Sequence, residues 1–178
     1  MKLIPIFLIS LFLFQFCSSK RVKPSVDSNF QTEQLPTQES WNSTITFSDS
    51  GKIKAILWTG HLRKYDDKRE TLLDQNLKVD FYDSTETKTT TLTSKSGRVD
   101  ETTNNLFAKD SVVVYSDSVV IKTDEMMWRN KDRKIVSDKF VTVISPKEKI
   151  EGYGFESDQN LRNYIIYNPT YVTRSDSL

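Results

Sequence analysis

A polar turn phrase recurs along this chain, with apolar residues at fixed distances on both sides of it. In 99–106 and 128–135, two apolar residues lie seven positions apart and enclose only polar residues. The segment 65–72 has the same form, and 155–161 resembles a shortened copy. A recurring turn between apolar positions is typical of repeated hairpins, which bury their apolar faces only by stacking on their neighbours.

The residues after each turn extend the repeat. Leu106 is followed by valines at plus six and plus eight, and Ile135 is followed by valines at the same offsets. Short runs rich in Thr, Val and aromatic residues fill the chain from Trp41 onward, without helical spacing. The sequence therefore predicts an all-β fold of stacked antiparallel hairpins. The expected strands are 43–47, 53–58, 77–82, 87–94, 112–115, 119–123, 140–145 and 164–167.

The chain begins with an apolar leader. Its fourteen residues 3–16 are almost wholly apolar. As a helix they would span about 21 Å, which is short against a hydrocarbon core of roughly 30 Å. Residues 1–17 are therefore predicted to be a signal or anchor segment. Cys17 closes it as in a bacterial lipoprotein, where the thiol is lipidated; an uncleaved anchor and simple secretion are the alternatives.

The next segment differs in composition from both of its neighbours. Residues 18–40 are polar, include two prolines and show no apolar period. They are predicted to be a flexible tether, which leaves 41–178 as the folded domain.

Composition excludes several function classes. Cys17 and His61 are the only residues of their kinds, so a zinc site of Cys and His ligands is excluded. His61 is also the one candidate base for a hydrolytic triad, and we interpret it as a surface residue of a strand. Lys and Arg number 25 against 24 Asp and Glu, which gives no charge excess for nucleic acid. We expect no enzymatic activity, no metal and no cofactor.

Five segments resemble the LptC family of the lipopolysaccharide export machinery, in the family's order. They are FSDSGKIKAILW (47–58), GRVDETTNNLFAKDSVVV (97–114), KTDEMMW (122–128), IVSDKFV (135–141) and IEGYGFESD (150–158). The related LptA and OstA-like proteins share the hairpin phrase, and the N-terminal anchor selects LptC. The resemblance implies a twisted, open β-jellyroll in the cell envelope, on the periplasmic face of the inner membrane.

The resemblance also implies a cargo and two protein partners. In the family, lipopolysaccharide or a similar glycolipid keeps its acyl chains inside the fold. Membrane subunits of an ABC exporter contact one end, and an LptA-like bridge protein receives the lipid at the other. The alternative from another class is an envelope lipoprotein that acts as a structural scaffold or chaperone and binds protein rather than lipid.

Alternation along the strands suggests which side chains would meet the cargo, although a one-residue error would move each of them to the other face. The candidate lining is Trp58, Phe81, Phe107, Val112, Val114, Trp128, Val141, Val143 and Phe155. The last strand, expected to end at Asn168-Pro169, is apolar and could pair with another chain through its edge. The docking candidates are Gly152, Gly154, Tyr164, Ile165, Ile166 and Tyr167.

Overall fold

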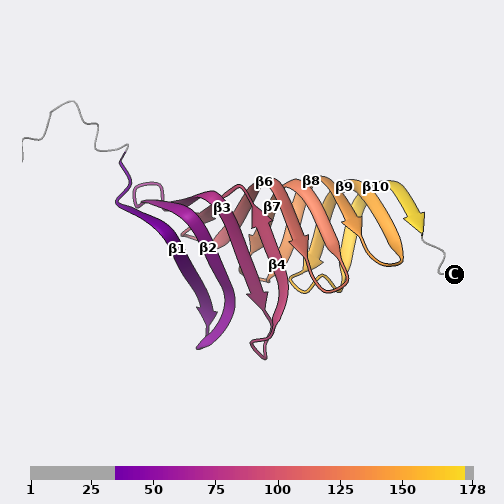
Figure 1. Cartoon of the computed structure of the whole chain (residues 1–178), viewed down its shortest axis with the longest axis horizontal. Coiled ribbons are helices and arrows are strands. Elements are labelled where there is room, and N and C mark those ends of the chain that lie inside the picture. The colour runs from indigo at the N-terminus through magenta and orange to yellow at the C-terminus, as the bar shows by residue number, and fades with distance from the viewer. Residues whose placement is uncertain (1–34, 175–178) are drawn as a thin grey trace, which may run out of the picture. The chain divides into compact units, whose positions relative to one another are not determined.

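The structure, a computed structural model, describes residues 35–174, which form one antiparallel sheet (Figure 1). Its ten strands are β1 (Gln38–Asp49), β2 (Lys52–Tyr65), β3 (Glu70–Tyr82), β4 (Lys88–Ser94), β5 (Ser96–Asp100), β6 (Asn105–Tyr115), β7 (Val120–Arg129), β8 (Lys134–Ile144), β9 (Glu148–Asp158) and β10 (Tyr164–Arg174). Residues 35–174 contain no helix, so the all-β prediction is confirmed. Most strands are longer than expected, because they continue through polar centres that the sequence alone marks as breaks.

Strands that follow one another in the chain are also neighbours in the sheet. The order is β1-β2-β3-β4-β6-β7-β8-β9-β10, and β5 pairs with both β3 and β6. β4 and β5 thus share one position in the sheet. The predicted polar turns connect β2 to β3, β5 to β6, β7 to β8 and β9 to β10. The prediction of stacked antiparallel hairpins is therefore confirmed.

The turn repeat corresponds to a row of residues paired across the sheet. Val99 pairs with Leu106, and Trp128 pairs with Ile135, as the seven-residue spacing requires. In the first copy, Thr71 pairs with Val99, so Thr71 and not Leu72 holds the repeated position. Counted from Thr71, the residues at plus six and plus eight are both buried apolar residues, Leu77 and Val79. The first copy obeys the same offsets once its register is moved by one residue.

Bulges near the centres of the strands lie side by side across the sheet. Gln75 and Asn76 in β3 have φ angles of 58° and 70°, and Asp110 and Ser111 in β6 have 65° and 55°. The Asn76 N–H donates to Lys95 O at 3.1 Å, and the Lys95 N–H donates to Asp110 O at 3.0 Å. Strand register shifts at the same level between β2 and β3, between β6 and β7, and between β8 and β9. A bulge bends its strand, and we call this line of bulges the crease.

The crease folds the sheet into two layers that face each other. Layer A comprises 38–41, 61–74, 96–109, 125–137 and 155–166, and layer B comprises 43–59, 77–94, 112–123, 140–152 and 168–174. Trp128 of layer A contacts Phe47 and Phe81 of layer B, with ring centroids 5.7 and 5.3 Å apart. In Figure 1, strands cross in front of and behind one another for this reason. The buried residues form one apolar core between the layers.

Polar contacts fasten the layers together on the side opposite the crease. Arg133, in the β7–β8 turn, donates to Asp49 Oδ2 at 3.1 Å. Gln159, in the β9–β10 turn, donates from Nε2 to Tyr82 O at 2.8 Å, and its backbone carbonyl oxygen accepts from Thr90 Oγ1 at 2.6 Å. We call these three contacts the seam. Each joins a turn of layer A to a residue at or near the turn-side end of a strand in layer B.

Candidate functional site

The interior between the layers is lined by rows of apolar residues that cross the sheet. One row of layer B passes without interruption through successive strand pairs. It consists of Ile45, Leu57, Val79, Leu92, Val114, Ile121, Val143, Ile150 and Val172. Its middle members are fully buried, whereas Val172 at the β10 end is 51% exposed. The apolar face therefore continues to the edge strands and is open to solvent at the β10 end.

Most of the predicted lining residues lie in this interior. Seven of them are buried: Phe81, Val112, Val114, Trp128, Val141, Val143 and Phe155. Trp58 and Phe107 lie half-buried on the outer faces of the sheet instead. Trp58 points to the face opposite its buried neighbour Leu57, and the Lys78 ammonium lies 4.9 Å from the centroid of the Trp58 ring. Phe107 lies between two inward-facing neighbours, and the Arg98 guanidinium lies 4.3 Å from its ring centroid.

The crease limits how far alternation can be followed along β2. In a regular strand, Trp58 and Leu62 would point to the same face because they are four residues apart. The pairing of β2 with β3 shifts between Thr59 and His61, so the inward parity changes at Gly60. Leu57 and Leu62 both face the core, although they differ by five positions. Alternation read from one end of such a strand gives the wrong face beyond the crease.

Several further residues line the interior that are absent from the predicted set, which favours large side chains over the cross-strand rows. They are Leu57, Leu77, Val79, Leu92, Leu106, Ile121 and Ile135, all of which are buried. The repeat itself holds the signal for some of them, because Leu77 and Val79 occupy the offsets counted from Thr71. Cross-strand pairing places the others: Leu57 and Leu92 lie beside Val79, Ile121 lies beside Val114, and Leu106 and Ile135 lie beside Trp128.

Trp128 occupies the centre of this interior. It is fully buried between Phe47 and Phe81. Its Nε1–H has no hydrogen-bond partner within residues 35–174. A buried donor without an acceptor costs about 1–3 kcal/mol. The interior therefore combines apolar walls with one unused polar group at its middle.

β10 forms one free edge of the sheet, since it pairs only with β9. The expectation that this strand ends at Asn168-Pro169 is wrong, because β10 continues to Arg174 with Pro169 inside it. Proline is tolerated on an edge strand, and the pairing shifts register next to Pro169. Ile165 and Tyr167 are 57% and 59% exposed, whereas Ile166 packs against the core.

The other docking candidates have contacts inside the β9–β10 pair. The Tyr164 hydroxyl donates to Glu148 Oε1 at 3.0 Å, and burial together with this hydrogen bond raises the pKa of Tyr164. Gly152 is buried, and a Cβ there would lie 2.4 Å from Asn168 O. Gly154 has a φ of +76° beside the Tyr167 ring. These contacts give structural reasons for both glycines.

β1 forms the opposite free edge. Trp41 on this strand is 60% exposed and stacks on His61, with ring centroids 5.2 Å apart. The His61 Nε2 lies 2.7 Å from Glu39 Oε1. His61 thus packs against side chains of the edge strand, in agreement with its interpretation as a strand residue.

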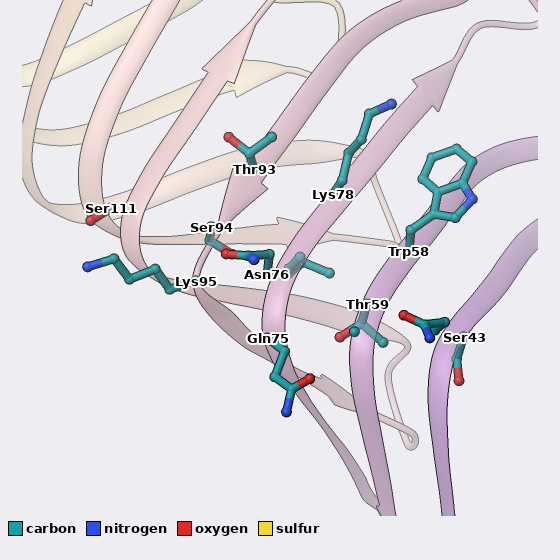
Figure 2. Close-up of a pocket in the computed structure, with 13 residues that line it drawn as sticks. Ser43, Trp58, Thr59, Gln75, Asn76, Lys78, Thr93, Ser94, Lys95 and Ser111 are labelled. Atoms are coloured by element: carbon teal, nitrogen blue, oxygen red, sulfur yellow. The ribbon is translucent and has the colours of Figure 1, made fainter.

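Two grooves lie on the outer surfaces of the sheet. One, of about 600 Å³, follows the crease, and Figure 2 shows Trp58, Lys78 and Lys95 among its lining residues. The other, also about 600 Å³, lies on layer A. Its floor is an apolar cross-strand row of Phe107, Met127 and Val136. Phe107 therefore belongs to an outer groove and not to the interior.

The predicted signal segment with Cys17 lies outside the described residues, as does most of the predicted tether. The sheet begins at Gln38, inside the range 18–40 assigned to the tether. Residues 35–174 include no helix that could cross a membrane. Over the same described range, no cluster of three or more His, Cys, Asp or Glu side chains could hold a metal ion.

Comparison with known families gives one match that spans most of the chain. The model described as "Lipopolysaccharide-assembly, LptC-related" matches residues 3–170. No curated protein gives a significant match. The matched range covers most of the predicted leader, the predicted tether, β1 to β9 and the first part of β10. The match agrees with the resemblance of the five segments, and it connects the protein with lipopolysaccharide transport in the cell envelope. The chain belongs to the LptC family.

Proposed function

We propose that this protein is a non-enzymatic carrier that binds lipopolysaccharide or a similar glycolipid between its two layers. It would receive the glycolipid from an inner-membrane ABC exporter and pass it to an LptA-like bridge protein in the periplasm. Family membership supports a role in lipopolysaccharide transport. The observation that carries the finer proposal is the apolar row of layer B, which runs from Ile45 on β1 to Val172 on β10.

The interior fits acyl chains better than it fits sugars. Its rows are built from Leu, Ile, Val and Phe, and acyl chains gain about 0.8 kcal/mol for each methylene removed from water. The Trp128 Nε1–H offers one donor within the apolar walls, so an ester or hydroxyl oxygen of a lipid could accept from it. Sugars and phosphates would remain outside in water.

Cargo entry requires the layers to separate, because Trp128, Phe47 and Phe81 fill the centre of the interior. At the seam, the layers are joined by contacts of side chains and not by backbone–backbone hydrogen bonds. Its contacts are one exposed ion pair and two hydrogen bonds from side chains. At the crease, by contrast, the strands themselves connect the layers. We therefore propose that acyl chains enter through the seam.

The free edges would serve the two protein partners. β10 carries exposed Ile165 and Tyr167 at one edge, and β1 carries exposed Trp41 at the other. Unpaired backbone groups of an edge strand are templates for a strand of another chain. We assign β10 to the bridge protein and β1 to the exporter. The leader 1–17 would hold the domain at the periplasmic face of the inner membrane.

A photo-reactive phenylalanine analogue in place of single residues tests the lipid path in cells with an active exporter. Phe47 faces the interior, and Phe140 is the matched control because it faces outward with 41% exposure. We expect lipopolysaccharide adducts at Phe47 and Trp128, and none at Phe140 or at the turn residue Lys131. Equal labelling of inner and outer positions, or labelling of none, would refute an internal lipid path.

The anchor is tested separately through Cys17. If Cys17 is lipidated, Cys17→Ala abolishes acylation and leaves an unprocessed precursor, which intact mass spectrometry of the membrane-extracted protein detects. An unmodified Cys17 in the wild-type chain with its N-terminus intact would exclude the lipoprotein form and leave the uncleaved anchor.

A further inference from the structure

The groove along the crease has a composition unlike the rest of the chain. Lysine and arginine nearly balance the acidic residues overall, at 25 against 24. Among the 13 residues that line this groove, two are lysines and none is acidic. The lysines are Lys78 and Lys95. The Lys78 ammonium already pairs with Asp80 Oδ2 at 3.3 Å, whereas Lys95 has no ion pair within residues 35–174, so Lys95 supplies the uncompensated charge. The groove therefore presents positive charge that attracts an anion.

Uncommitted polar side chains surround these lysines. Ser43, Thr93 and Ser94 use their hydroxyls in hydrogen bonds with the protein. In the described part of the chain, the side chains of Asn42, Gln75 and Asn76 make no such bonds, and all three are exposed lining residues. Amide side chains that both donate and accept suit a ligand rich in hydroxyl groups.

Trp58 supplies an apolar surface in the same groove. It is half-buried on the outer face of layer B, and Figure 2 shows it beside Lys78 in the wall of the groove. The flat indole ring matches the apolar C–H face of a pyranose sugar in the way that aromatic rings match other flat apolar surfaces. An indole next to a cation and several amides is thus suited to a sugar that carries a negative charge.

The backbone of the groove is held in an uncommon conformation. Asn42, Gln75, Asn76 and Ser111 line it with φ angles of 50°, 58°, 70° and 55°. Residues other than glycine adopt such angles at a cost in free energy, and positions of this kind concentrate at functional sites. Here residues with these angles lie along the crease, and all four line one groove.

We propose that the crease groove binds an anionic saccharide, with Trp58 as the stacking surface and with Lys78 and Lys95 as the charge partners. The site lies on the outside of the sheet and is distinct from the interior proposed for acyl chains. Two envelope sources have this chemistry: the phosphorylated oligosaccharide of a glycolipid, and the acidic aminosugar fragments of the cell wall. Saccharide binding in this groove does not require acyl chains between the layers.

Binding to the full-length chain in detergent micelles tests the site, with the indole N–H resonance of Trp58 as the local readout. The probes are deacylated phosphorylated lipopolysaccharide oligosaccharide, a soluble disaccharide-peptide of peptidoglycan, a neutral oligosaccharide of similar size, and inorganic phosphate. We expect at least one anionic saccharide to shift the Trp58 resonance, and the neutral oligosaccharide and phosphate to bind at least tenfold more weakly. The anionic probe that binds shows whether the natural ligand comes from the glycolipid or from the cell wall.

Variants connect the binding to the two lysines. The double variant Lys78→Ala/Lys95→Ala should lower the affinity for the anionic saccharide by tenfold or more, because each charge-assisted contact contributes about that factor. Lys88→Ala is the matched control, since Lys88 approaches the same Asp80 carboxylate as Lys78, at 3.9 against 3.3 Å, but does not line the groove. Unchanged affinity in the double variant, equal binding of phosphate alone, or no shift of Trp58 with either anionic saccharide would overturn the proposal. Because soluble saccharides carry no acyl chains, that failure would leave the internal lipid path untouched.

Discussion

Replacing Trp128 measures how strongly the interior holds the two layers together. The side chain is fully buried, and its ring contacts Phe47 and Phe81 of the opposite layer. Truncating a buried tryptophan to alanine destabilises a protein by about 3–5 kcal/mol. The two ring contacts lie in the range where aromatic pairs add about 0.5–1.5 kcal/mol each. Against these losses, Trp128→Ala removes the unpartnered Nε1–H, which recovers about 1–3 kcal/mol.

We therefore expect Trp128→Ala to lower the free energy of unfolding by about 3–5 kcal/mol. Trp128→Phe keeps a ring in contact with both layers and removes the same donor. Its loss should stay below about 2 kcal/mol, because the smaller cavity and the removed donor oppose each other. Trp58→Ala, on the outer face, is the control and should change stability by less than about 1 kcal/mol.

Equilibrium unfolding of the full-length chain in urea, followed by far-UV circular dichroism, gives these differences. With a slope of about 1–3 kcal/mol per molar urea, a loss of about 4 kcal/mol lowers the midpoint by roughly 2 M. If Trp128→Ala costs less than about 1 kcal/mol, the ring contacts do not hold the layers together. If Trp128→Phe costs as much as Trp128→Ala, the indole N–H has an acceptor in solution and the account of an unused donor fails.

Three further predictions concern the edge strand and the charged surface. Ile165→Pro removes a backbone donor from β10 and should reduce co-purification of the bridge protein while most of the sheet stays folded; capture at normal strength would place the docking edge elsewhere. Gly152→Ala brings a Cβ to 2.4 Å from a backbone oxygen of β10 and should cost about 1–3 kcal/mol, with hydrogen-exchange protection lost in β10 and kept in β2 to β4; uniform protection would contradict this. The hydrogen bond from Lys134 lowers the pKa of Glu156, so its stabilising effect is complete above the ordinary glutamate pKa and disappears as pH falls through the lowered value. Glu156→Gln should therefore flatten the acid side of the curve of Tm against pH, and an unchanged curve would refute the assignment.

The sequence predicts the hairpins well because their signals are local. The polar phrase between Val99 and Leu106 is a turn in the structure, and the spacing of seven residues reappears as direct cross-strand pairs. β-rich runs on each side of such turns have few alternatives to antiparallel pairing. The all-β fold and the order of the strands follow from these local features, with the family resemblance in agreement.

The crease is harder to predict because one extra residue in a strand leaves little trace in the sequence. Asp110 and Ser111 look like a polar interruption, yet β6 continues through them. Leu57 and Leu62 both face the core because of a register shift in the pairing of β2 with β3, which alternation within one strand cannot show. The end of β10 is wrongly predicted for a similar reason. Proline usually interrupts a strand, but Pro169 is accommodated because β10 lies at the edge of the sheet.

The seam and the strand ladders differ in how far apart their residues lie in the chain. Ladder partners belong to successive strands or, for β3–β5 and β4–β6, to next-but-one strands, whereas the seam joins residues separated by 69, 77 and 84 positions. Local contacts form quickly in folding, and contacts between distant residues form late. We therefore expect the hairpins to pair as the chain emerges from synthesis or translocation, and the closure of the layers to be complete only after β9 and the turn that follows it are available. A chain truncated before Gln159 would keep most of its ladder and lose two of the three seam contacts. Hydrogen exchange on such a truncation would separate the order of the sheet from the closure of its interior.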